Sequence, residues 1–224
     1  RSFGKGTSTS EKRLFTPTSR RTQAMFFTAL AFCLLNIGAS ASLATANNSV
    51  NVLIPVSSQT GWTLAFAQHV AEGCANVTGF TATCKVQRVN ETSCADVEAA
   101  DALIIGTPVH FASMAGEVVE FMASWQTKCF GWPKIKEVMS PKVGGAFCTG
   151  GQQASGKDTA RLGIMSGMTS AGMTVTGGAT GFGASATHAD GVPTPSFTDA
   201  EITEARALAS RVAGLTYALL RGGN

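Results

Sequence analysis

The stretch ALIIGTPVHFASMAGEVVEFMASW (residues 102–125) contains a complete strand–loop–helix unit. Its first residues form an uninterrupted apolar run that ends at Gly106, which is typical of a strand buried on both faces of a sheet. Apolar residues then recur at intervals of three and four, which predicts a helix over residues 113–127. The apolar positions of this helix are Val118, Phe121, Met122 and Trp125. Such a unit is the repeating element of an α/β fold.

The same alternation continues along the chain. Four more strands are predicted, at residues 50–56, 80–86, 141–148 and 173–177. Four more helical segments are predicted, at residues 61–75, 94–100, 159–171 and 198–220. Five strands alternating with five helices predict an α/β fold, in which an open parallel sheet is covered by helices on both faces. Ligands bind beyond the carboxyl ends of such strands, so we expect the site in the loops after Val56, Gly106, Cys148 and Gly177.

Residues 1–46 differ in composition from the rest of the chain. Residues 1–24 hold six basic residues, one acid and nine Ser or Thr, and the apolar run at 25–37 is followed by small residues that end in Ala44-Thr45-Ala46. That run is shorter than the ~20 residues that span a bilayer, and a signal peptidase accepts the small-x-small form. We expect residues 1–46 to be a removable targeting leader, with an uncleaved anchor as the alternative. Residues 47–224 would then form one domain without a stable membrane span.

Two export routes fit this leader. If Met25 is the initiator, the leader is an ordinary signal peptide for the secretory pathway or the extracellular space, where three sequons, at Asn47, Asn76 and Asn90, would be usable. If the upstream segment is translated, it resembles a transit peptide. In that case Arg20-Arg21 before the apolar run resembles a twin-arginine signal for the plastid lumen.

The leader also carries the positive charge of the chain. Of the 224 residues, 44% are apolar and 14% are charged, and the formal net charge is +3. Six of the 17 basic residues and one of the 14 acidic residues lie in the leader, which leaves 11 basic and 13 acidic residues, a net charge of −2, on residues 47–224. Nucleic-acid binding requires clustered positive charge on the folded part, so we expect no nucleic-acid partner.

Five cysteines follow the leader: Cys74, Cys84, Cys94, Cys129 and Cys148. They contain no C-x-x-C, and His69, His110 and His188 lack metal-ligand spacing, so we expect no metal. One or two disulfides would form in an oxidising compartment and leave at least one thiol free. Cys148 ends an apolar strand and is at least as well explained as a small buried hydrophobe.

Three predicted loops have residues suited to a ligand with a phosphate and a flat ring. The first is Ser57-Ser58-Gln59-Thr60-Gly61-Trp62-Thr63, whose hydroxyls and glycine before a helix suit a phosphate, with a capped helix start and no ligand as the alternative. The second, Gly106–Gly116, is apolar and aromatic with one imidazole, and suits a flat ring. The third, Cys148–Gln153, offers backbone N–H groups that approach a ligand closely because Gly lacks a Cβ.

These loops, together with Thr180–Ala184 (TGFGA), resemble the WrbA-type NAD(P)H:quinone oxidoreductases, which are flavodoxin-like FMN proteins. That family has an S-x-x-G loop, a G-T-P-x-x-F-x-x-M-x-G loop and a T-G-x-G-G-Q-type loop. The second motif is the most specific, and its fixed positions are all in register here: Gly106, Thr107, Pro108, Phe111, Met114 and Gly116. The resemblance runs from about Asn51 to the C-terminus.

The resemblance implies a flavodoxin-like five-stranded parallel sheet with FMN as the cofactor. The residues that it places at the FMN phosphate are in the first loop: Ser58, Gln59, Thr60, Gly61, Trp62 and Thr63. Those that it places beside the isoalloxazine ring are Pro108, Val109, His110, Phe111 and Ala112. Those that it places over the polar edge of the ring are Thr149, Gly150, Gly151 and Gln152.

The implied activity is two-electron transfer from NAD(P)H, as co-substrate, to a small quinone-like acceptor. The flavin carries that chemistry, so no acid–base pair is required. His110 is the catalytic candidate, as a hydrogen-bond donor to flavin or acceptor. The family has Arg at this position, has a His where this chain has Ser170-Ala171, and has a longer segment between the second and third strands. A homo-oligomer, dimer or tetramer, is also expected from the resemblance.

Two other functions fit parts of the sequence. An exported flavodoxin-like protein without catalytic activity would bind a partner or store electrons. A nucleotide triphosphate would be bound at Gly151–Asp158 (GQQASGKD), which differs by one residue from G-x-x-x-x-G-K-[ST]. Asp158 stands in place of the hydroxyl that binds Mg²⁺ in that motif, which disfavours the second alternative.

Overall fold

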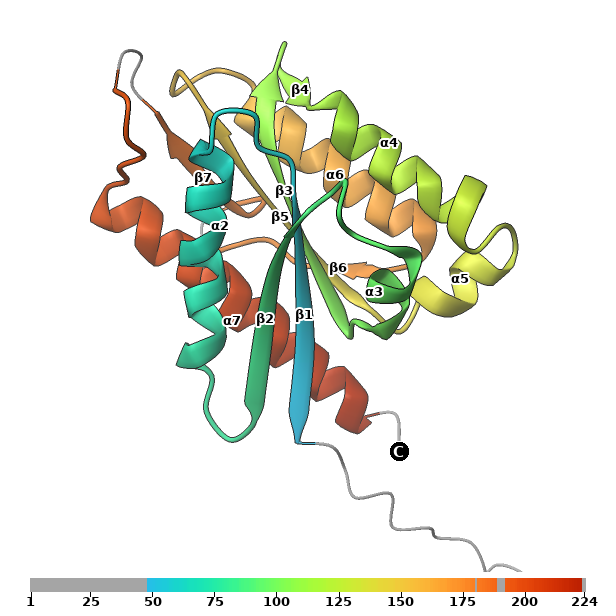
Figure 1. Cartoon of the computed structure of the whole chain (residues 1–224). Coiled ribbons are helices and arrows are strands. Elements are labelled where there is room, and N and C mark those ends of the chain that lie inside the picture. Colours follow the sequence, from blue (N-terminus) through green and yellow to red (C-terminus); the bar gives the residue numbers. More distant parts are fainter. Residues whose placement is uncertain (1–47, 180, 189–191, 223–224) are drawn as a thin grey trace, which may run out of the picture. The chain divides into compact units, whose positions relative to one another are not determined.

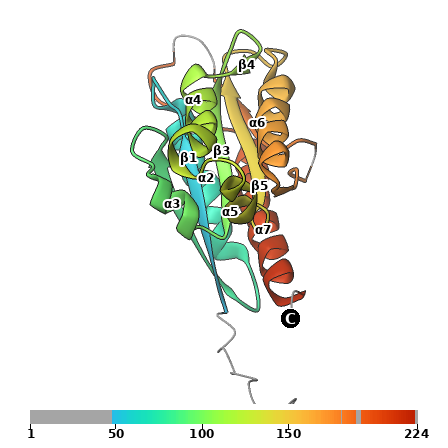
Figure 2. The ribbon, with the colours of Figure 1, turned by 90° about the vertical axis from the view of Figure 1, so that its right-hand side faces the viewer.

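The structure, a computed structural model of the chain, describes residues 48–179, 181–188 and 192–222 (Figure 1). The predicted leader lies outside these residues. A parallel sheet runs through the middle of the described part, with helices on both faces (Figure 2). None of the helices described is long and apolar enough to cross a membrane.

Strands and helices alternate, as predicted. The strands are β1 Ser49–Val56, β2 Thr81–Arg88, β3 Ala102–His110, β4 Ser113–Met114, β5 Val143–Gly150, β6 Thr174–Val175 and β7 Ala184–Thr187. The helices are α2 Trp62–Glu72, α3 Cys94–Ala99, α4 Gly116–Ser124, α5 Lys134–Met139, α6 Lys157–Ala171 and α7 Asp199–Gly222. A 3₁₀ turn (η1, Gly73–Asn76) continues α2, and a π-helical turn (η2, Trp125–Cys129) continues α4.

The strand order is β2-β1-β3-β5-β6, and these strands are parallel. The chain passes from β1 to β2 at one edge and returns to place β3 on the other side of β1. The order therefore reverses between β1 and β3, which is where open α/β sheets bind ligands. The predicted fold class, a flavodoxin-like five-stranded parallel sheet, is confirmed.

Two short strands share the fifth position of the sheet. β6 pairs with the start of β5, at Val143 and Gly144, and β7 pairs with its end, from Phe147 to Gly150. The predicted strand at 173–177 is therefore too long, and β7 was not predicted. The chain re-enters the sheet at Gly183, where a Cβ would lie 1.9 Å from the carbonyl oxygen of Ala146. A side chain at this position would prevent β7 from pairing.

The hairpin β3–β4 corrects the predicted helix over residues 113–127. The strand β4 pairs antiparallel with the end of β3, so α4 begins at Gly116 rather than at Ser113. The chain reverses at Phe111 and Ala112, where φ is +48° and +59°. Positive φ at both central residues is the geometry of a two-residue hairpin turn. The sequence conceals this turn because neither residue is Gly, Asn or Asp.

The sheet is buried between two helical layers. Helices α2 and α7 cover one face, and α3, α4, α5 and α6 cover the other. The first core includes Val50, Ile54, Val56, Phe66 and Phe147. The second core includes Leu53, Leu103, Ile105, Val118 and Met168. Burial on both faces explains why the central strands are continuous apolar runs.

Two disulfides connect elements that pack together. Cys74 in η1 is bonded to Cys84 in β2, and Cys94 at the start of α3 is bonded to Cys129 at the end of η2. Cys148 is free and fully buried. The prediction of one or two bridges, with at least one thiol left free, is confirmed for the described part of the chain.

Close packing between the end of α2 and α7 gives a test of the fold. A Cβ at Gly73 would lie 2.1 Å from the carbonyl oxygen of Arg206 in α7. We predict that Gly73→Ala lowers the free energy of unfolding by about 1–3 kcal/mol, because backbone must shift to admit the methyl group. Gly214→Ala is the control, because its Cβ meets nothing within 4 Å, and a helical alanine raises stability by roughly 0.5–1 kcal/mol. Urea unfolding measures both, and equal stability of Gly73→Ala and wild type would contradict this packing.

Candidate functional site

The loop after β1 wraps around the start of α2. Ser58 is buried, and its Oγ accepts a hydrogen bond from the N–H of Leu64 at 3.1 Å. Gly61 precedes the helix with φ +92°, and no side chain from that position caps the helix. The first N–H groups of a helix lack intrahelical acceptors, and together with the helix dipole they attract anions. The exposed Thr60 adds a hydroxyl, so this donor set fits a phosphate.

Two charged residues that the sequence analysis missed hold this loop. Nη1 of Arg88, at the end of β2, donates to the carbonyl oxygen of Ser58 at 2.6 Å. Oγ of Ser57 donates to Oε2 of Glu117, in the first turn of α4, at 2.6 Å. The guanidinium group places positive charge beside the expected phosphate site. The position of Arg88 at the carboxyl end of a strand next to β1 is the signal that would have found it.

The hairpin β3–β4 carries the second loop and raises an aromatic ring above the sheet. Phe111, at its tip, has an exposed fraction of 106%, so the described residues cover none of its ring. A non-glycine residue in the left-handed region costs roughly 1 kcal/mol, and such strain gathers at ligand sites. The N–H of Ala115 donates to Thr107 Oγ1 at 2.9 Å and fixes the base of the hairpin. This geometry fits a ligand that packs a flat face on the ring.

The loop after β5 packs against both other loops. Thr149 Oγ1 lies 2.9 Å from Thr63 Oγ1, and both hydroxyls are buried. A Cβ at Gly156 would lie 2.4 Å from Cα of Ala112, so this loop touches the hairpin tip. A Cβ at Gly150 would lie 2.6 Å from Ser155 Oγ. Glycine is therefore required at position 156 for this loop to approach the hairpin tip.

The structure thus brings all three predicted loops to the carboxyl edge of the sheet, at the top of Figure 1. His110 pairs with Ser113 within the hairpin, and its side chain is half-buried at this edge. The ring of His188 lies 5.1 Å from that of Trp62, and the backbone N–H of His188 donates to the carbonyl oxygen of Gly150 at 3.1 Å. The role expected of each residue toward a cofactor stays a prediction.

The segment Ser170-Ala171, where the WrbA-type family has a His, lies elsewhere. It ends α6, and the next strand, β6, pairs with the first residues of β5. Ser170-Ala171 is therefore at the amino edge of the sheet, opposite the three loops.

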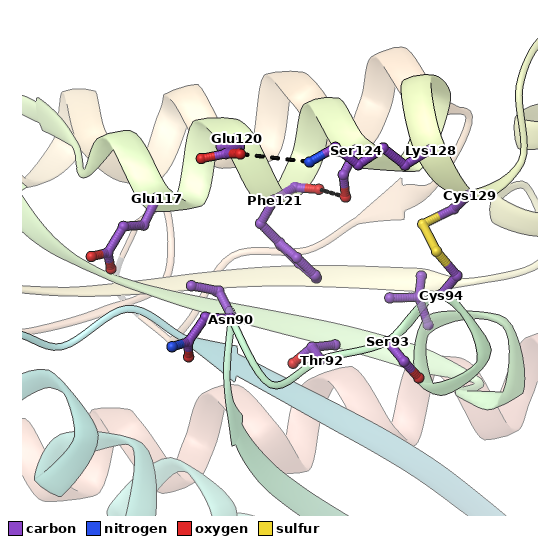
Figure 3. Close-up of a pocket in the computed structure, with 12 residues that line it drawn as sticks. Asn90, Thr92, Ser93, Cys94, Glu117, Glu120, Phe121, Ser124, Lys128 and Cys129 are labelled. Carbon is purple, nitrogen blue, oxygen red and sulfur yellow. Dashed lines mark hydrogen bonds and ion pairs between the residues drawn. A yellow bond between two sulfur atoms is a disulfide. The ribbon is translucent and has the colours of Figure 1, made fainter.

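A cavity of about 480 Å³ adjoins the first loop (Figure 3). It lies between α4 and the segment after β2, and Phe121 projects from α4 toward Thr92. Lys128 pairs with Glu120 at its rim at 3.6 Å, and the Cys94–Cys129 disulfide closes one end. Glu117, which accepts from Ser57, lines the same cavity. The Ser57–Glu117 hydrogen bond therefore connects the cavity with the phosphate-type loop.

Comparisons with known proteins agree with this geometry. The chain is 32% identical over 153 residues to an NAD(P)H dehydrogenase (quinone) of Solidesulfovibrio magneticus, an alignment that covers 57% of this chain and 71% of that protein. The chain belongs to this family. An NAD(P)H dehydrogenase (quinone) of Cupriavidus metallidurans is 31% identical over 146 residues, with 56% of this chain and 69% of that protein covered. The profile of the NADPH-dependent FMN reductase family matches residues 77–187.

Solved structures support the fold of this NAD(P)H dehydrogenase (quinone) family member. A WrbA-like flavodoxin from Agrobacterium tumefaciens superposes with a TM-score of 0.58 at 19% identity, covering 75% of this chain and 97% of that chain. An archaeal flavodoxin superposes with a TM-score of 0.56 at 18% identity, covering 75% and 99%. The resemblance to WrbA-type proteins is confirmed, and so are the oxidoreductase class and the FMN and NAD(P)H dependence, at the level of the family.

The thiol of Cys148, beneath this site, gives a test of how tightly the end of β5 is packed. Burial raises its pKa to about 12, and its Sγ donates to the carbonyl oxygen of Lys157 at 3.5 Å. The thiolate is the reactive form of a cysteine. We therefore predict that Cys148 reacts negligibly with a thiol reagent at pH 8 in the native protein, and that about one thiol per chain reacts in denaturant. The protein used is a Cys33→Ser variant, in which the cysteine of the predicted leader is replaced. Reaction of the native protein as fast as the denatured one would contradict the burial of Cys148.

Proposed function

We propose that this family member holds FMN at the three-loop edge and transfers two electrons from NAD(P)H to a quinone-like small molecule. The observation that carries this proposal is the fully exposed Phe111 on a left-handed turn, at the same edge as the start of helix α2, where Gly61 supplies no capping side chain. Bound FMN would supply the two-electron chemistry between NAD(P)H and the acceptor. The protein must then supply binding, orientation and electrostatics.

The first loop would hold the phosphate. Helix α2 directs its first N–H groups toward the loop, and the hydroxyls of Ser58 and Thr60 lie in the loop itself. Arg88 fixes the carbonyl oxygen of Ser58 and adds positive charge without occupying the loop. Glu117 accepts a hydrogen bond from the Ser57 hydroxyl, so that hydroxyl cannot donate to a phosphate while this hydrogen bond is made.

The other two loops would orient the ring. Phe111 offers an apolar face, and Pro108 restricts the backbone at the end of β3. Gly150 and Gly151 let the third loop bring its N–H groups close to a polar ring edge. His110, between Pro108 and the turn, would donate a hydrogen bond from its imidazole to the flavin or the acceptor.

The compartment is part of the proposal. Residues 1–46 would be a removable leader, and residues 47–224 the FMN-binding domain that it exports. Two disulfides support an oxidising compartment, because such bonds are rare in the cytosol. The sequon asparagines Asn76 and Asn90 are exposed, as glycosylation in a secretory route requires.

Flavin content and turnover test the proposal in two steps. We predict that the purified protein binds FMN, seen as flavin absorbance that remains after desalting, and that it oxidises NADH or NADPH with benzoquinone as acceptor. A colourless protein that does not take up added FMN would overturn the proposal. Bound FMN without NAD(P)H oxidation would instead identify a protein that stores electrons.

Phe111→Ala tests the ring contact separately from the phosphate contact. Because the native ring contacts little protein, we predict unchanged stability and a dissociation constant for FMN that rises about tenfold. Leu219→Ala is the matched control, since it truncates an exposed apolar side chain near the end of α7. Fluorescence titration of the apoprotein with FMN measures both variants. Equal affinity of Phe111→Ala and Leu219→Ala for FMN would exclude a contact between Phe111 and the flavin.

A further inference from the structure

A second cavity, of about 510 Å³, lies at the start of α6 next to β7 and the first turn of α7. Its walls are more polar than those of the cavity in Figure 3. Its wall includes Lys157, Asp158 and Arg161 of α6, Ser185 and Thr187 of β7, and Glu201 of α7.

Two cationic side chains in the wall of this cavity are buried. Lys157 is 8% exposed and Arg161 is 6% exposed. Nζ of Lys157 donates to Thr187 Oγ1, and Nη1 of Arg161 donates to the carbonyl oxygen of Gly183 at 2.6 Å. Burial lowers the pKa of Lys157, which means that its charged form lacks some of the solvation that it has in water. A bound anion would restore that stabilisation.

The two carboxylates of the cavity already accept hydrogen bonds from the protein. Glu201 Oε1 accepts from the N–H of Thr187 at 2.7 Å, and Oε2 accepts from the N–H and the hydroxyl of Thr198 at 2.9 and 3.0 Å. Asp158 Oδ1 accepts from Nη2 of Arg161, and the Asp158 side chain is 71% exposed. Both carboxylates therefore already accept hydrogen bonds from β7, from the start of α7 or from Arg161.

Several donors are left over in the described part of the chain. Nε of Arg161 is buried and has no hydrogen-bond partner there. Lys157 has three N–H donors and makes one hydrogen bond with them. The hydroxyl hydrogens of Thr187 and Ser185 have no acceptor among the contacts of the described residues. The ammonium group of Lys157 and the half-buried hydroxyls of Ser185 and Thr187 line the cavity, so a ligand that brings acceptors and negative charge can pair with them.

The start of α6 adds further hydrogen-bond donors to this cavity. The helix has 15 residues and follows Gly156, whose φ is +82°, and no side chain from that position caps it. Its first N–H groups and its dipole favour an anion. This is the segment whose spacing approaches that of a triphosphate-binding loop, but Asp158 is paired with Arg161 and supplies no hydroxyl for Mg²⁺. The geometry therefore suits a phosphate group without a metal ion.

We propose that this cavity binds a phosphate group. Thr187 pairs with Gly150, and Gly156 touches Ala112, so the cavity lies at the same edge of the sheet as the three loops. The phosphate has two sources, a phosphate of NAD(P)H or free inorganic phosphate, and the first source rests on the proposed function. The charges of Lys157, Arg161, Asp158 and Glu201 sum to zero, so we expect weak binding, with a dissociation constant of about 1 mM.

Titration of the purified apoprotein with inorganic phosphate and with adenosine 2′-phosphate, at constant ionic strength, tests the site without any flavin. Calorimetry or phosphorus NMR should detect saturable binding, with adenosine alone as the blank. Lys157→Met keeps the apolar stem of the side chain and should weaken phosphate binding about tenfold. Lys142→Met is the matched control, because Lys142 is equally buried but lies next to the amino end of β5.

Two results would overturn the site: no saturable phosphate binding by the wild type, or equal binding by Lys157→Met and Lys142→Met. If Lys157→Met does not fold, as judged by circular dichroism, Ser185→Ala replaces it, with an expected loss of about threefold. Equal binding by Ser185→Ala and the wild type would then count against the site.

Kinetics distinguish the two sources once the site is established. If the phosphate is that of the co-substrate, Lys157→Met should raise the KM for NADPH about tenfold with little change in kcat, because a contact made equally in ground and transition states affects KM alone. An unchanged KM for both NADH and NADPH would assign the site to free phosphate. A protein without flavin or turnover would overturn the proposed function and leave the phosphate titration valid.

Discussion

Strand β5 sets the distance between the sheet and each helical layer, because α6 and α7 pack directly on its backbone. All eight of its residues are buried. A Cβ at Gly144 would lie 2.5 Å from Sδ of Met168 in α6, and one at Gly145 would lie 3.0 Å from a methyl carbon of Val212 in α7. Two adjacent glycines thus seat one helix on each face. Because α6 is held at this depth, Lys157 at its start lies at the carboxyl edge, beside the loops that would bind the cofactor.

The sequence was sufficient for the order of elements, because burial on both faces leaves a continuous apolar run for each central strand and a periodic pattern for each helix. It was not sufficient for the hairpin turn, since Phe111 and Ala112 are residues that rarely take positive φ. Strand β7 was also missed, because four small residues give little pattern and their pairing depends on the close approach at Gly183.

The candidate site, like the fold, could be predicted from the sequence only in part. Its three loops were predictable because the carboxyl ends of parallel strands share one edge of the sheet. The reversal of strand order between β1 and β3 marks the position along that edge where a ligand binds. The charged residues were not predictable. Arg88 contacts Ser58 and Lys157 contacts Thr187, each across 30 residues of sequence, and such pairings leave no local pattern. Their positive charges act locally within residues 47–224, whose net charge is −2, so short hydrogen bonds would hold a small anion while the overall field would not attract a polyanion.

The Cys94–Cys129 disulfide closes a loop of the chain that contains α3, the β3–β4 hairpin, α4 and η2. The exposed turn at Phe111 therefore lies within a stretch of chain whose two ends, Cys94 and Cys129, are joined by a covalent bond. Exposed turns are the positions that proteases cut first. A cut between Phe111 and Ala112 would leave both new ends attached to the same molecule, so the cleaved protein would separate into two fragments only after reduction.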